Sequence, residues 1–134
     1  MKYRSIALLL TVAALAVASL ACGGSFTTAN IQDAYMSSDV DGENRTTVYG
    51  QDAIFYAQVD LANAPDDTTL KAVWVAVDAA DVDPNFQIDE TEFTSDDGLI
   101  HFELSNDQLW PVGEYKVDIY LNDTLTKTLL FEVQ

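Results

Sequence analysis

The sequence predicts an all-β protein, an antiparallel sandwich of seven to eight strands. Residues 115–121 alternate between apolar and polar side chains, and this period of two marks a strand with one buried face. Just before this strand, Pro111 and Gly113 form a corner that no helix would carry. Beyond residue 21, no segment has a convincing helical period of 3.6 residues. Together, these three observations favour a sheet protein.

The first strands are expected between residues 31 and 61. Residues 31–36 read as a strand, and the polar segment 37–47, with an Asp-Gly turn at 41–42, leads to a short strand at 48–49. Residues 53–61 alternate well. This alternation places Phe55 and Val59 toward the core and Gln58 outside.

The remaining strands follow the turn cluster at 63–67. In residues 70–77, Trp74 faces inward, opposite a row of valines, and residues 99–104 and 125–133 also alternate. Asn122 and Asp123 suit a tight hairpin turn before the last strand. The acidic segment 78–97 is expected to be mostly loop, with a short strand at 86–88 or 92–93. The residues assigned to the core are Phe55, Trp74, Phe102, Tyr115, Ile119 and Phe131.

Two of these features resemble immunoglobulin-like sandwiches. A corner followed by Tyr115 at the start of an alternating strand resembles their tyrosine corner, and Trp74 in the third long strand resembles their buried strand C tryptophan. The flanking cysteines of antibody domains are absent, so the resemblance is to bacterial immunoglobulin-like and fibronectin type III modules, over about residues 48–134. Such modules share a fold without sharing a function.

The N-terminal residues resemble a bacterial lipoprotein leader. Lys2 and Arg4 precede an apolar segment at 6–18, and residues 19–22 (Ser-Leu-Ala-Cys) resemble a lipobox, although Ser19 stands where that motif prefers an aliphatic residue. The resemblance implies lipidation of Cys22. We therefore expect a signal peptide at 1–21, a lipidated flexible tether at 22–30 and the sandwich domain at 31–134. The alternative is a retained anchor helix, because the uncharged run 5–21 approaches the length of a membrane span.

These features predict an exported protein, lipid-anchored to the bacterial cell membrane or outer membrane and facing away from the cytoplasm. The formal net charge is −16, and loss of the leader would leave four basic against 22 acidic residues, a charge of −18. Such a field repels nucleic acid and anionic headgroups and attracts cations or basic partners. Solubility or a salty habitat is the simpler explanation of this charge and comes first. With Cys22 as the only cysteine, no disulfide is expected.

The acidic segment contains a candidate calcium loop. Asp81, Asp83, Asn85, Gln87, Asp89 and Glu92 occupy positions 1, 3, 5, 7, 9 and 12 of a twelve-residue window, a spacing that suits a hard cation. Three departures oppose an EF-hand: Phe86 stands where a sharp turn needs Gly, Pro84 stiffens the loop, and strands flank it. The alternative is a solvated acidic loop. Residues 39–43 are a weaker version of the same pattern.

No enzyme and no resident cofactor is predicted. His101 is the only histidine, so neither a catalytic triad nor a multi-histidine metal site is available, and no Gly-rich phosphate loop is present.

The candidate functional surface is a patch for a protein partner. It consists of residues on the outer side of two neighbouring strands: Val73, Val75, Val77 and Tyr120. High strand propensity of valine, or cover by Phe26 of the tether, would explain the patch without a partner. The leading function is a noncatalytic binding or adhesion module. A calcium-binding module and a structural spacer without a ligand are the alternatives.

Overall fold

The computed structural model describes residues 28–134, and the predicted leader, Cys22 and most of the predicted tether lie outside these residues. The described part contains eight strands and no helix that could cross a bilayer. The strands are β1 (Asn30–Ser37), β2 (Val48–Tyr49), β3 (Phe55–Ala62), β4 (Thr69–Ala79), β5 (Phe86–Thr94), β6 (Gly98–Leu104), β7 (Gly113–Leu121) and β8 (Thr124–Val133).

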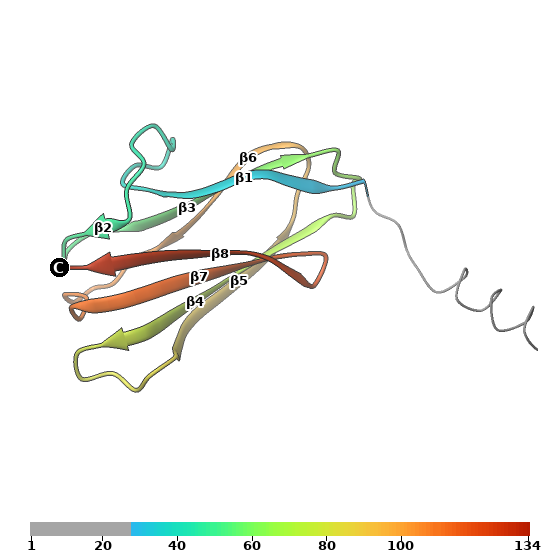
Figure 1. The fold of residues 1–134 in the computed structure, drawn as a ribbon. Helices are drawn as coiled ribbons and strands as arrows, with labels where there is room; N and C mark the ends of the chain where they lie inside the picture. The colour runs from blue at the N-terminus through green and yellow to red at the C-terminus, as the bar shows by residue number, and fades with distance from the viewer. Residues whose placement is uncertain (1–27) are drawn as a thin grey trace, which may run out of the picture.

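The strands form two sheets that face each other (Figure 1). One sheet has three strands in the order β1-β3-β6, and the other has five in the order β2-β8-β7-β4-β5. All neighbouring strands are antiparallel except β2 and β8, which run parallel over only two residue pairs. This arrangement confirms the predicted all-β sandwich and its strand number.

Aromatic rings fill the space between the sheets. Phe55 is fully buried, and its ring centroid lies 4.6 Å from that of Trp110, 4.8 Å from Phe131 and 4.9 Å from Tyr49. Trp74 and Tyr115 are each 1% exposed, as the alternation predicted. Offset and edge-on ring pairs at these distances stabilise a core beyond the area that they bury. The six residues assigned to the core from the sequence are all buried.

The corner before β7 has the predicted tyrosine geometry. The Tyr115 hydroxyl donates a hydrogen bond of 2.6 Å to the carbonyl oxygen of Pro111, four residues upstream. Burial of this phenol raises its pKa above the ordinary value. Gly113 has φ +154°, and a Cβ at this position would overlap the carbonyl oxygen of Asp78 on β4. The corner therefore depends on a hydrogen bond and on a missing side chain.

Gln58 does not face solvent as predicted. It is 1% exposed because the 38–47 loop folds over it. Its Nε2 donates to Ser37 Oγ at 3.1 Å, to the Val40 carbonyl at 3.0 Å and to the Asp39 carbonyl at 3.3 Å. A buried amide is stable only with such partners, so Gln58 fixes the loop against the three-stranded sheet.

The acidic segment is more regular than predicted. β5 spans nine residues and pairs with β4 along almost its whole length, with one irregularity between Trp74 and Val75. The segment alternates poorly in sequence because most of its residues are exposed on both faces of an edge strand.

Candidate functional site

The predicted binding face lies on the outer side of the five-stranded sheet, where β4 and β7 are neighbours. Tyr120 is the cross-strand partner of Lys71, and Val75 is the partner of Lys116. Val73, Val77 and Tyr120 are half-buried, whereas Val75 is only 8% exposed. The prediction of a jointly exposed patch is therefore wrong for Val75, which lies on β4 with paired neighbours on both sides, β5 and β7.

Charged side chains cover part of this face. Lys71 Nζ lies 4.5 Å from the centroid of the Tyr120 ring and 3.4 Å from Glu90 Oε1. On the neighbouring strand, Lys116 Nζ lies 3.1 Å from Asp118 Oδ2. Half-buried ion pairs and a cation over an aromatic face occupy the surface that the valines were expected to offer. The face is consequently polar from Tyr120 as far as Lys116, which is the cross-strand partner of Leu130.

The opposite end of the same face is hollow and apolar at its floor. A cavity of about 310 Å³ is lined by Val77, Leu130, Glu114, Glu132 and Thr47. Leu130 is 67% exposed, and the two glutamates belong to neighbouring strands as a cross-strand pair. We call this site the Leu130 hollow. It combines an exposed aliphatic side chain with two carboxylates, and it contains one residue of the predicted face, Val77.

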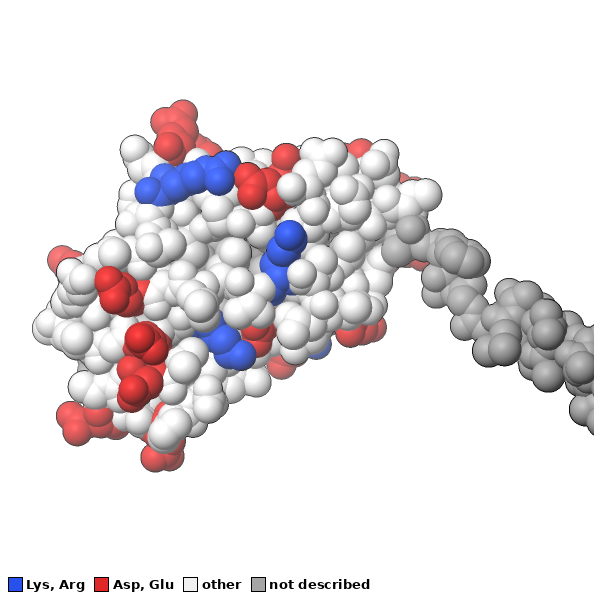
Figure 2. Space-filling view, in the orientation of Figure 1, with Lys and Arg blue, Asp and Glu red and all other residues white. Residues whose placement is uncertain are grey.

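A second groove adjoins the Leu130 hollow. It has a volume of about 600 Å³, lies between β1 and β8, and shares Thr47 and Leu130 with the hollow. The face with β1 and β8 in front carries basic side chains near its middle, and most acidic side chains lie toward its margins (Figure 2). The groove, whose apolar lining includes Ala34, Met36 and Leu129, extends the Leu130 hollow around the edge of β8 toward β1.

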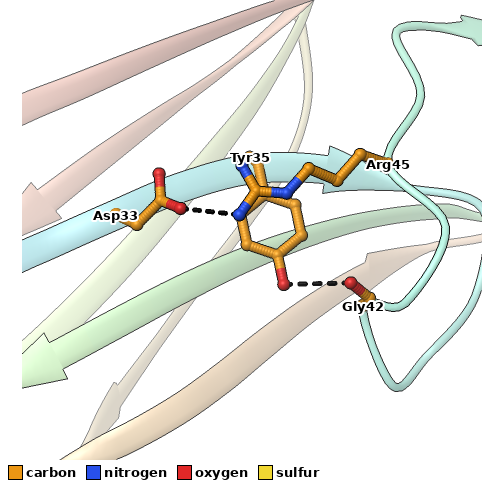
Figure 3. Close-up of polar contacts among 4 residues, drawn as sticks. All are labelled: Asp33, Tyr35, Gly42 and Arg45. Carbon is orange, nitrogen blue, oxygen red and sulfur yellow. Dashed lines mark hydrogen bonds and ion pairs between the residues drawn. The ribbon is translucent and has the colours of Figure 1, made fainter.

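The groove between β1 and β8 has a fixed wall (Figure 3). The Arg45 guanidinium lies 3.7 Å from the centroid of the Tyr35 ring and makes a 2.8 Å ion pair with Asp33. The Tyr35 hydroxyl donates to the carbonyl of Gly42 at 3.0 Å. Because Arg45 is already paired and stacked, this cluster holds the 38–47 loop rather than offering a free cation to an anionic ligand.

The candidate calcium residues do not converge. Asp81, Asp83 and Asn85 lie in the turn before β5, whereas Asp89 and Glu92 lie within β5. Asp89 is opposite Trp74 and Glu92 is opposite Lys71, so the two carboxylates point to opposite faces of the sheet. Within residues 28–134, no three His, Cys, Asp or Glu side chains group so that they could hold a metal ion. The predicted loop geometry is therefore wrong.

In the weaker calcium pattern at residues 39–43, the Asp39 carboxylate is already used by hydrogen bonds within the loop. Asp39 accepts hydrogen bonds from the backbone amides of Asn44 at 2.8 Å and Glu43 at 2.9 Å. These amides lower the pKa of the Asp39 carboxyl below its ordinary value. Both carboxylate oxygens shape the loop.

Sequence reasoning missed the residues of the Leu130 hollow. The signal was present, because alternation in the last strand placed Leu129, Phe131 and Val133 inward and so left Leu130 outside. The grouping of Leu130 with Val77 could not be foreseen, since it requires the order β8-β7-β4 across the sheet.

Comparison with known structures addresses the fold. An immunoglobulin-like protein from Pseudomonas aeruginosa superposes with a TM-score of 0.51 at 17% identity, covering 83% of this chain and all of that chain. The fold is immunoglobulin-like. An alkylpurine DNA glycosylase from Pseudomonas fluorescens (TM-score 0.53, 11% identity) and a β-glucosidase from Listeria innocua (TM-score 0.50, 13% identity) also match.

The two enzyme matches are partial. This immunoglobulin-like chain is covered to 87% and 84%, but it spans only 33% of the glycosylase and 17% of the glucosidase. No protein-family model matches the sequence, and no curated protein matches it. At these identities, the neighbours support the fold alone, so function has to be argued from this chain's own surface.

Proposed function

We propose that this immunoglobulin-like chain is a noncatalytic binding module, anchored to the outer side of a bacterial membrane through a lipidated Cys22, that holds a partner protein at the Leu130 hollow. The observation that carries the proposal is the exposure of Leu130 above a floor that includes Val77. A leucine exposed to this extent beside a cavity gains free energy when a partner covers it, about 1.5–3 kcal/mol for complete burial.

The carboxylates around the hollow define the partner's chemistry. Glu114 and Glu132 face each other across β7 and β8, beside Leu130. An apolar anchor within a charged rim is the usual anatomy of a protein interface, in which the rim adds specificity and association rate. We infer that the partner presents an apolar side chain flanked by lysine or arginine. The chain's strongly negative charge would accelerate that encounter.

Capture from the solubilised native envelope tests the hollow. The chain, its Leu130→Asp variant and its Leu125→Asp variant are each immobilised, and the captured proteins are identified by mass spectrometry. Leu125 is also exposed on β8 but lies outside the hollow, so it is the matched control. The proposal expects a partner that the native chain and Leu125→Asp retain and Leu130→Asp loses. Equal capture by all three, or no capture, would instead favour a structural spacer.

Mass spectrometry of the mature protein tests the anchor independently. The expected result is a chain that begins at Cys22 and carries acyl chains. Two or more chains are needed for stable attachment, because each buried CH₂ contributes only about 0.8 kcal/mol. Cys22→Ser should prevent lipidation. A free Cys22 thiol, or a chain still beginning at Met1, would refute this part of the proposal.

A further inference from the structure

The two sheets are unequal, and part of one inner surface is left without cover by residues 28–134. The three-stranded sheet ends at β6, while the five-stranded sheet continues to β5. Phe93 of β5 reaches back to Phe102 of β6, with 4.9 Å between ring centroids. Phe86 lies on the same inward side of β5, opposite the core residue Ala76, yet it is 51% exposed. A strand added beside β6 would cover this surface.

Within residues 28–134, no strand pairs with the outer edge of β6, which we call its free edge. The amide of Thr46 donates to the carbonyl of Met36, so the backbone N–H and C=O groups of Met36 point away from β3. In antiparallel pairs, backbone groups alternate between the two edges of a strand. Met36 pairs with Ala57, so the backbone groups of Ala57 point away from β1 and toward β6. Ala57 in turn pairs with Phe102, so the backbone groups of Phe102 point toward β3. The residues whose N–H and C=O groups face the free edge are therefore Leu99, His101 and Glu103.

The other sheet edges carry features that discourage strand addition. β8 is partly covered by β2, has an irregular register near Tyr120 and carries the inward-pointing, exposed Lys127. β1 has a register shift and is capped by the 38–47 loop. β5 has a register shift and three carboxylates. Bulges, inward charges and covering loops are the known means of protecting edges. β6 has an uninterrupted register, no lysine and no proline.

A small apolar pocket lies where β6 ends. Its volume is about 150 Å³, and its lining includes Phe86 and Ile88 of β5, Asn106 after β6, and Trp110 and Pro111 of the corner. A cavity of about this size accommodates a benzene-sized group. One large apolar side chain of an added strand would fit there.

The surroundings of this edge are acidic. Within residues 28–134, the nearest strands and loops contribute Asp89, Asp96, Asp97, Glu103 and Asp107, and the one basic side chain of β4, Lys71, is paired with Glu90 on the other face. An incoming segment with lysine or arginine at alternate positions would complement this charge.

We propose that the free edge of β6 accepts an extended segment of a partner protein as an added strand, with apolar residues alternating with basic ones. Backbone hydrogen bonds to Leu99, His101 and Glu103 supply affinity, and the inward apolar residues cover Phe86 and fill the pocket beside it. A second copy of this chain is a poor occupant, because two chains that each carry a formal net charge of −16 repel each other.

The experiment uses the full chain and three synthetic octapeptides. One alternates Val and Lys, one is identical but N-methylated at alternate residues, and one replaces each Val with Ser. Amide hydrogen exchange is followed by NMR. The alternating peptide should slow exchange of the Leu99, His101 and Glu103 amides at least tenfold. The other two peptides should not slow exchange. Equal protection by the Ser peptide, or protection at Leu130 instead, would overturn the proposal.

Two variants at one position separate backbone from side chain. His101→Ala keeps the edge amide and should bind the alternating peptide as the native chain does. His101→Pro removes that amide at a position where an edge strand tolerates proline, and should lose binding at least tenfold with an unchanged melting temperature. Binding that survives in His101→Pro would refute strand addition, and the N-methylated peptide decides the matter if this variant does not fold. Leu130→Asp should still bind, so failure here is distinguishable from failure at the hollow.

Discussion

Tyr115→Phe tests whether the corner hydrogen bond stabilises the sandwich. The change removes only the hydroxyl that donates 2.6 Å to the Pro111 carbonyl and leaves the ring stacked on Phe131. A hydrogen bond contributes about 0.5–1.5 kcal/mol net, and a buried acceptor left unsatisfied costs about 1–3 kcal/mol. We therefore expect a loss of about 1.5 kcal/mol in the free energy of unfolding. For a domain of this size, the melting temperature should fall by roughly 6–12 °C.

Urea denaturation followed by tryptophan fluorescence measures this loss, with Tyr120→Phe as the matched control. The Tyr120 hydroxyl makes no hydrogen bond within residues 28–134, and the ring that Lys71 covers is retained in this variant. The two variants should show the same dependence on urea and different midpoints. If Tyr115→Phe were as stable as Tyr120→Phe, the corner would be a consequence of the fold and not a source of its stability.

Four further outcomes follow from the same contacts. Gly113→Ala should lower the melting temperature more than Gly98→Ala. An alanine at position 98 has space around it and adds only backbone strain of about 1–3 kcal/mol, whereas one at position 113 would also overlap β4. Burial raises the pKa of Tyr49 to about 12, so stability should fall as the pH rises from 10 to 12, and less steeply in Tyr49→Phe. Gln58→Met should cost about 1–3 kcal/mol and speed amide exchange in the 38–47 loop. Millimolar Ca²⁺ should produce no calorimetric heat and no rise in melting temperature, whereas site occupancy at 100 Kd would add about 2.7 kcal/mol.

Features that depend only on residues close together in the sequence could be predicted. A strand with one buried face repeats every two residues whatever lies opposite it, so β3, β4, β6 and β7 were recognisable. The corner was recognisable for a similar reason, because Pro111, Gly113 and Tyr115 act within five residues of one another.

Features that depend on tertiary neighbours could not be predicted. Gln58 is buried only because a loop that begins twenty residues earlier lies over it, and no alternation can report that cover. Val75 is buried by the strands on both sides of it. Asp89 and Glu92 have suitable spacing for a calcium loop, but pairing with β4 extends this segment and places the two carboxylates on opposite faces.

The described chain enters the sandwich at one end, and the Leu130 hollow lies toward the other. β1 begins beside the end of β3 and the start of β6, where Asn30, Ala62 and Gly98 lie, and the opposite end of the sandwich holds the C-terminus (Figure 1). Leu130 and Glu132 lie toward that opposite end, and an eight-residue strand such as β1 spans about 26 Å. An anchor at Cys22 would therefore attach the sandwich at the end opposite the Leu130 hollow, which leaves the hollow accessible to a partner protein. Moving the anchor to the C-terminus should reverse this geometry and reduce capture of the partner by intact cells, while capture by the detached domain stays unchanged.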